Sequence, residues 1–157
     1  MKKQGLIPSF ISLVVLSIVI ITTIVFVIDH IILIGPILII LGILPWIPLR
    51  IFGRSIRSCG ADIIFGAVDT GILGIATIIG ASFAGVLGAI VGGAVGDSIT
   101  DGIAGLFEGK IAIFLRNHGI EEARTPLSSS LGKMSGCLLG IGIILTVLWS
   151  FLGIYRF

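Results

Sequence analysis

Long runs of isoleucine, valine and leucine dominate the chain, and polar residues interrupt them at only a few points. The runs lack the alternation of polar and apolar residues that a membrane β-barrel requires. A helix needs about 20 apolar residues to cross a bilayer, and it satisfies its backbone hydrogen bonds internally. The pattern therefore predicts an all-α, polytopic membrane helical bundle. Its five expected spans are approximately 6–28, 31–49, 61–79, 83–105 with a helical extension to about 116, and 135–154.

Short polar, glycine and proline segments mark the expected turns. Asp29-His30 separates the first two spans, and an alternative places this turn at Gly35-Pro36, which shifts both helices by a few residues. Pro45 and Pro48 should break or kink the end of the second span, because proline cannot donate a helical hydrogen bond. Gly80-Ala81-Ser82 is the expected turn between the third and fourth spans.

The basic residues predict an orientation. Five spans gather nine of them on one side of the membrane: Lys2, Lys3, Arg50, Arg54, Arg57, Lys110, Arg116, Arg124 and Lys133. Only Arg156 lies opposite. Because positive charge marks the cytoplasmic side, we expect the N-terminus inside and the C-terminus outside. Four spans, with the third and fourth merged into a re-entrant pair, would disturb this asymmetry. Trp46 near the inner interface and Trp149 near the outer one agree with five spans.

Composition narrows the class further. Of the 157 residues, 56% are hydrophobic and only 11% are charged, whereas a soluble domain carries roughly 25% charged residues. The length suits one transmembrane domain over 1–157, located in the cell membrane with the lipid bilayer as its main partner. A net charge of +2 without a basic, aromatic patch argues against nucleic acid. Cys59 and Cys137 form no CxxC pair and indicate no disulfide framework.

Small residues appear inside the apolar runs from Gly60 onward. Helices in lipid associate by close backbone approach, which small residues permit. Two GxxxGxxxG ridges are therefore expected to pack helices, within the chain or between copies. The first consists of Gly88, Gly92 and Gly96, and the second of Gly132, Gly136 and Gly140. The ridges are not expected to contact each other, since the first lies in the outer half of the membrane and the second in the inner half. Self-association, or a partner in a membrane complex, is expected because five short helices enclose little space.

Most of the acidic residues fall on the third and fourth spans or the inner continuation of the fourth: Asp62, Asp69, Asp97, Asp101 and Glu108. At about 100° per residue, Asp62 and Asp69 share one helix face, and the other three share a face opposite the first glycine ridge. A hairpin turning near Ala81 would put Asp62 level with Asp101 and Asp69 within a turn of Asp97. Asp69 would then lie about 12 Å from the inner end of its helix.

An ionised carboxylate in hydrocarbon costs at least about 2.5 kcal/mol, so such residues normally face a cavity, an ion or a partner. This predicts a hard-cation or proton pathway formed by Asp69, Asp97, Asp62, Asp101, Thr70 and Ser98. Carboxylate and hydroxyl oxygens suit a divalent cation such as Mg²⁺, Ca²⁺ or Mn²⁺, or a proton relay; the sequence does not identify the metal, and no other cofactor is expected. A structural alternative places Asp62 and Asp101 at the interface and lets Asp97 cap a helix beginning after Gly96.

Residues Asp97–Gly102 resemble the start of the signature of CDP-alcohol phosphotransferases, which combines DxxDG, an Ala-Arg pair and a later GxxxDxxxD. Here the spacing is DxxxDG, the arginine is missing and no second aspartate pair follows. The carboxylates for that family's metal pair are lacking, and the family is excluded. Nothing else indicates an enzyme, so a membrane-embedded lipid enzyme is the most distant of three hypotheses. The first is a small cation or proton transporter or channel, and the second is a structural or accessory subunit packing through its glycine ridges.

One polar stretch separates the fourth and fifth spans. Residues 121–130 are expected to form a solvated inner loop, with Ser130 or a neighbour capping the last helix. Lys133 begins that helix and is expected to snorkel to the interface or to pair with Glu108.

Overall fold

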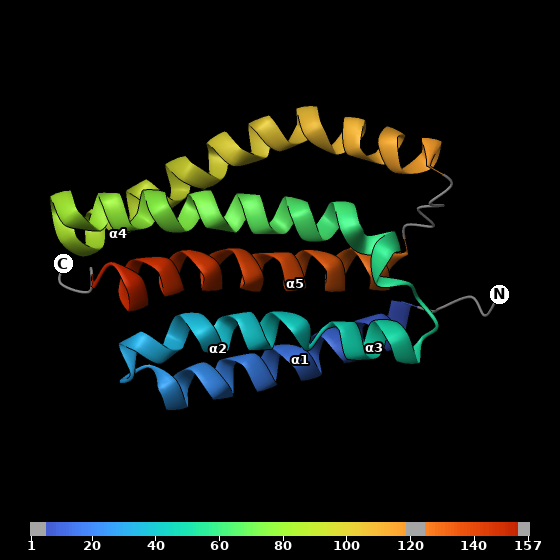
Figure 1. Ribbon diagram of the computed structural model, residues 1–157, viewed down its shortest axis with the longest axis horizontal. Helices are drawn as coiled ribbons and strands as arrows, with labels where there is room; N and C mark the ends of the chain where they lie inside the picture. Colours follow the sequence, from blue (N-terminus) through green and yellow to red (C-terminus); the bar gives the residue numbers. More distant parts are fainter. Residues whose placement is uncertain (1–5, 119–124, 154–157) are drawn as a thin grey trace.

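A computed structural model describes residues 6–118 and 125–153, and every regular element in these ranges is helical. Two antiparallel helices begin the chain, α1 (Leu6–Val27) and α2 (Ile31–Ile43), as Figure 1 shows. The expected turn at Asp29-His30 is confirmed, with the His30 amide donating to the Val27 carbonyl oxygen at 2.8 Å. The alternative turn at Gly35-Pro36 is wrong, because both residues lie inside α2.

Pro45 ends the second helix as expected, whereas Pro48 lies inside the short helix that follows. After Ile43 the α-helix is interrupted at Leu44-Pro45. A short helix, α3 (Trp46–Ile51), follows. Gly53, with φ of 69°, closes α3 in a Schellman motif, in which its own amide donates to Arg50 at 2.9 Å and the Arg54 amide donates to Leu49 at 2.8 Å. A 3₁₀ turn, η1 (Ile56–Cys59), then leads directly into α4 (Gly60–Asn117).

Helix α4 doubles back on itself (Figure 1). Its helical geometry is interrupted at Ala84 (φ −142°) and at Gly85 (φ 57°, ψ −135°). We call residues 60–83 the first limb and residues 86–117 the second limb. The expected turn at Gly80-Ala81-Ser82 is wrong, because these residues remain helical in the first limb. Gly85 takes the reversal because a residue without a Cβ adopts positive φ at little cost.

The last helix, α5 (Pro126–Leu145), continues into a π-helical turn, η2 (Thr146–Phe151). It begins well before the expected start near Ser135. Thr125 supplies the reason: its hydroxyl oxygen accepts from the Ser128 amide, and the Ser128 hydroxyl oxygen accepts from the Thr125 amide, a reciprocal capping box with proline at the first helical position.

The expectation of a solvated loop over 121–130 is therefore wrong where it can be checked. Ser128, Ser129 and Ser130 lie in the first turns of α5, Ser128 is buried, and the cap is Thr125 instead of Ser130. Residues 121–124 lie outside the described ranges.

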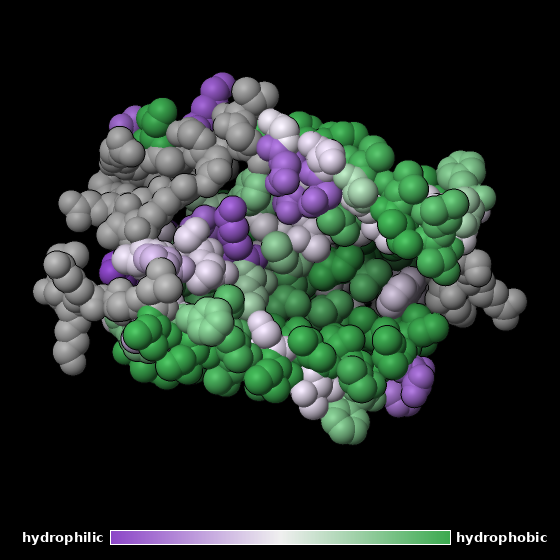
Figure 2. All heavy atoms as spheres, turned by 180° about the vertical axis from the view of Figure 1, so that it is seen from behind, coloured by the Kyte–Doolittle hydropathy of each residue, from purple (hydrophilic) through white to green (hydrophobic). Residues whose placement is uncertain are grey.

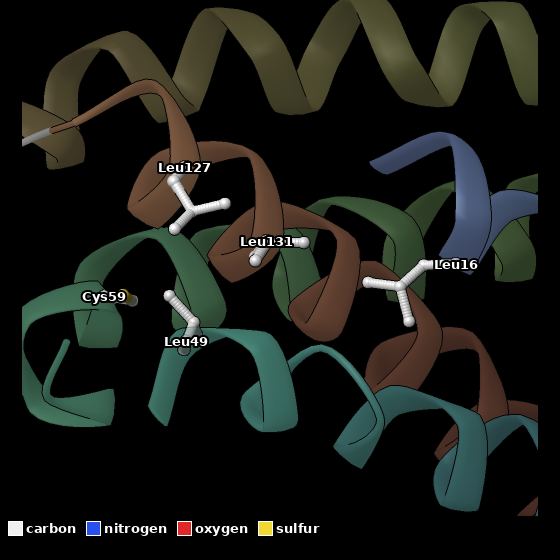
Figure 3. Packing of buried hydrophobic residues seen from close by; sticks show 5 residues of the cluster. All are labelled: Leu16, Leu49, Cys59, Leu127 and Leu131. Carbon is white, nitrogen blue, oxygen red and sulfur yellow. The ribbon is translucent and has the colours of Figure 1, made fainter. Parts of the chain in front are cut away.

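Helix α5 lies between α2 and the first limb of α4, and the second limb packs on the far side of the first (Figure 1). Figure 3 shows the main apolar cluster, whose members come from four elements, α1, α3, η1 and α5: Leu16, Leu49, Cys59, Leu127 and Leu131. Elsewhere large apolar side chains point outward on every long helix. Four helical stretches are long and apolar enough to cross a membrane, within 7–27, 31–51, 56–103 and 126–149, and the third of them contains the reversal of α4.

Candidate functional site

The closest polar contact between the two limbs of α4 joins Asp69 to Thr100. Thr100 lies on the second limb and is only 4% exposed, and its hydroxyl donates a hydrogen bond to the half-buried Asp69 carboxylate. The backbone carbonyl oxygens of Gly96 and Asp97 lie 3.0 Å from the same hydroxyl and offer it alternative acceptors. The Asp69 carboxylate and the Thr100 hydroxyl thus meet between two apolar helices, and this hydroxyl can donate either to the carboxylate or to a backbone carbonyl oxygen of its own helix.

The reversal at Gly85 fixes which residues of the limbs lie level. Counted from this point, Asp69 stands opposite Thr100, which lies three residues, less than one turn, beyond Asp97. Asp69 therefore lies within a turn of Asp97, as expected, whereas Asp62, seven residues before Asp69, is not level with Asp101, one residue after Thr100. The sequence interpretation did not pair Thr100 with Asp69, because it placed the turn near Ala81 instead of at Gly85.

Asp97 and Asp101 are exposed on the second limb, as is Ser98. The Ser98 hydroxyl donates to the Ala94 carbonyl oxygen of its own helix at 2.9 Å, and so it does not point across to the first limb. Figure 2 shows hydrophilic side chains interrupting the otherwise hydrophobic surface. The side chain of Glu108, expected to continue this acidic face, lies outside the described residues.

Asp62 faces α5 instead of the second limb. It is 2% exposed, its carboxylate accepts a hydrogen bond from the Ser129 hydroxyl at 3.2 Å, and its Cβ lies against Gly132. The sequence interpretation missed Ser129, because it placed this serine in a loop. A threonine followed by proline, read as a helix cap, would have put Ser129 on the first turn of α5.

Thr70 and Gly66 lie on the first limb beside the two acids. Thr70 is half-buried. A Cβ on Gly66 would lie 2.7 Å from the Lys133 carbonyl oxygen, so this glycine permits close approach of α5 and leaves no open space. Lys133 itself is exposed, with its ammonium 5.1 Å from the centre of the Phe65 ring, an arrangement that favours a cation–π contact.

Each glycine ridge lies against the first limb of α4. On one side, Cβ atoms on Gly88 and Gly92 would collide with the backbone oxygens of Gly80 and Ala76. On the other side, Cβ atoms on Gly136 and Gly140 would collide with those of Ile63 and Ala67. Gly96 and Gly132 extend the two contacts. The first limb is therefore the central helix of a three-helix contact.

The chemistry available at these acids is that of oxygen ligands and proton acceptors. Within residues 6–118 and 125–153, no three histidine, cysteine or acidic side chains come together in a way that could hold a metal ion. Asp69 with Thr100 and Asp62 with Ser129 are instead two separate carboxylate–hydroxyl contacts. Such pairs can accept and release protons.

No family model, no curated protein and no solved structure matches this chain.

Proposed function

We propose that this protein is a small multi-pass membrane transporter or channel that passes protons through the α4 hairpin, with Asp69 as the central acceptor. The observation that carries the proposal is the pairing of Asp69 with a neutral hydroxyl, Thr100, between two apolar limbs. A carboxylate placed at this depth is costly when ionised, and a hydroxyl offsets that cost less than a cation would. Protonation of the Asp69 carboxylate would remove this cost.

Protons fit these contacts better than a divalent cation. A hard cation such as Ca²⁺ takes six to eight oxygen ligands, and the carboxylates of Asp69 and Asp62 have separate hydroxyl partners on different helices. Hard cations remain the second substrate class to test.

The proposal includes five membrane spans with the N-terminus inside. Arg50 in α3, Arg54 in the turn after it and Arg57 in η1 lie at one end of the bundle (Figure 1). The reversal of α4 and the turn between α1 and α2 lie at the opposite end. This separation supports the charge asymmetry on which the orientation rests.

Self-association through the second limb is part of the same proposal. Asp97 and Asp101 are exposed among the outward-facing apolar residues Val95, Ile99 and Ile103. Each carboxylate facing lipid would cost at least about 2.5 kcal/mol, so a second copy covering this face would relieve that cost. The glycine ridges offer no such surface, because both already have neighbours within the chain. An accessory role through these ridges gains no support from the fold.

The test is proton flux into liposomes containing the purified protein and a pH-sensitive dye, driven by a potassium diffusion potential. Wild-type protein should acidify the lumen faster than protein-free liposomes. Asp69→Asn should lower the protein-dependent rate at least about tenfold, because an amide cannot take up the proton. Thr100→Val should change the rate less. Asp29→Asn, which alters an exposed acid in the α1–α2 turn, is the matched control and should leave the rate unchanged.

Retention of the wild-type tryptophan emission and elution volume establishes that each variant is folded. A folded Asp69→Asn protein that conducts protons at the wild-type rate overturns the role of Asp69. Parallel assays with Mg²⁺, Ca²⁺ and Mn²⁺ extend the test, and absence of flux for protons and all three cations overturns the transport proposal.

A further inference from the structure

Three arginines lie on one tight turn between α3 and α4. Arg50 ends α3, Arg54 follows the glycine of the Schellman motif, and Arg57 lies in η1. The Ser55 hydroxyl oxygen accepts from the Arg57 amide at 3.2 Å and fixes the start of η1. Two successive backbone motifs thus hold the three positions in a defined arrangement. We call Arg50, Arg54 and Arg57 the arginine turn.

The arginine turn is anchored to the bundle from behind. Leu49 is fully buried in the apolar cluster of Figure 3, and the Trp46 indole N–H donates to the Ser135 hydroxyl oxygen of α5 at 2.8 Å. Arg50 and Arg57 are exposed and Arg54 is half-buried. The turn is therefore a fixed feature whose basic side chains face outward.

Apolar side chains are exposed beside these arginines. Ile47 is 56% exposed and Ile51 is 74% exposed, and both belong to the six-residue helix that carries Arg50. Isoleucine next to arginine is unfavourable at a surface that faces only water. It suits the boundary of a bilayer, where the isoleucines contact acyl chains and the guanidinium groups reach the headgroups.

Among the described residues, the three guanidinium groups also have no acidic partner. Guanidinium groups bind phosphate oxygens through paired N–H donors, and the anionic lipids of an inner leaflet carry such phosphates at this boundary. We propose that the arginine turn binds the headgroup phosphate of an anionic phospholipid. The site is independent of proton transport, because it shares no residue with the α4 acids.

The experiment measures the lipid next to Trp46 by fluorescence quenching. Trp149→Phe leaves Trp46 as the only tryptophan, and the Trp149 indole nitrogen has no described hydrogen-bond partner to lose. This parent variant is placed in vesicles that mix phosphatidylglycerol and phosphatidylcholine, with bromine on either lipid in turn. Brominated chains quench a nearby indole, so the two series give the relative affinity for the anionic lipid.

At about fivefold per arginine near an anionic surface, the parent should prefer phosphatidylglycerol by more than about tenfold. Replacing all three residues of the arginine turn with glutamine should bring the ratio close to one. Replacing Lys2, Lys3 and Lys110 with glutamine removes the same charge and should leave most of the preference. Arg50→Gln alone should lower the preference about fivefold, and it provides the decisive measurement if the triple variant loses the native Trp46 emission maximum.

Equal affinity for the two lipids in the parent overturns the proposal, as does an unchanged preference in the folded Arg50→Gln and triple variants. Inorganic phosphate and chloride at matched ionic strength separate a lipid from a soluble phosphate ligand. Equal weakening by both salts supports the lipid, whereas displacement by phosphate alone assigns the site to a soluble phosphorylated molecule and overturns it. A loss of proton flux in Asp69→Asn without change in this lipid preference would confirm that the two sites are separate.

Discussion

Three hydroxyl side chains join helices that are far apart in the sequence. Thr100 links the two limbs of α4, Ser129 links α5 to Asp62, and Ser135 links α5 to the break between α2 and α3. In an apolar surrounding a serine or threonine can hydrogen-bond without carrying a charge, so these contacts position helices at low desolvation cost. The polar residues of this chain therefore determine the register between neighbouring helices, in addition to any chemistry that they perform.

Ser135 offers the sharpest test of this role. It is fully buried, and it accepts from the Trp46 indole at 2.8 Å while donating to the Gly42 carbonyl oxygen at 2.6 Å. Gly42 lies in the last turn of α2, whose carbonyls lack helical partners beyond the proline break. Ser135→Ala leaves both groups without this partner and should lower the free energy of unfolding by about 1–3 kcal/mol.

Detergent titration followed by circular dichroism measures this change. Ser82→Ala is the control, because the exposed Ser82 hydroxyl donates only to the Ile79 carbonyl oxygen of its own helix. It should stay within about 0.5 kcal/mol of wild type. Equal stability of the Ser135→Ala and Ser82→Ala proteins would show that the link between α2 and α5 contributes nothing.

The sequence indicated which residues were candidates but not which of them meet. Helical spacing placed Asp62 and Asp69 on one helix face, but Asp62 contacts α5 and Asp69 contacts the second limb. Pairing Asp69 with Thr100 depends on where the limbs of α4 reverse, and a shift of a few residues in that turn changes every level across the hairpin. The contacts between helices therefore could not be predicted from the sequence, whereas the candidate acidic residues could.

At the scale of elements, glycines set how closely the helices approach. The first limb of α4 has a glycine ridge against each of two sides, one from the second limb and one from α5. A single methyl group at such a contact meets backbone atoms, which cannot move aside as a flexible side chain can. Where a glycine faces open space, the same methyl group should instead stabilise the helix, because alanine has the higher helix propensity.

Gly136→Ala and Gly102→Ala separate these two effects. A Cβ at Gly136 would collide with the Ile63 carbonyl oxygen, whereas one at Gly102 has no atom within 4 Å. Gly136→Ala should lower the free energy of unfolding by about 1–3 kcal/mol through overpacking. Gly102→Ala should keep or raise it, by at most about 1 kcal/mol. The same detergent titration measures both, and a Gly136→Ala protein as stable as Gly102→Ala would show that α5 and the first limb are not held together by close backbone approach.

Some element boundaries could be predicted and others could not. Asp29-His30 and Pro45 were identified because a polar pair or a proline within an apolar run acts locally. The reversal of α4 was misplaced because many glycines lie between Gly80 and Gly96, and only packing selects Gly85 among them. The early start of α5 was missed although its signal, Thr125 before a proline, is local.

On the scale of the whole molecule, the α4 hairpin decides the topology. The first limb holds about 24 residues and spans roughly 36 Å at 1.5 Å per residue, which exceeds the hydrocarbon thickness of about 30 Å. A limb of this length is long enough to cross the bilayer even when tilted, and the second limb is longer still. Residues at the reversal, including Phe83 and Val86, are exposed and apolar, as expected at the edge of the headgroup region.

Five spans with the N-terminus inside predict which residues a membrane-impermeant thiol reagent reaches. In a protein whose own cysteines, Cys59 and Cys137, are changed to alanine, Ala84→Cys should react from the outside of intact cells, as Asp29→Cys does. Arg57→Cys should react only after permeabilisation, because it lies at the opposite end of the bundle. Ala84 is exposed, and its φ of −142° suits any residue, so the probe leaves the reversal intact.

If Ala84→Cys reacts only after the membrane is dissolved in detergent, the hairpin ends inside the bilayer and α4 is re-entrant. If Ala84→Cys and Asp29→Cys both require permeabilisation while Arg57→Cys does not, the orientation is reversed. In that case the arginine turn would face the outer leaflet, and the charge asymmetry of the chain would not set its insertion.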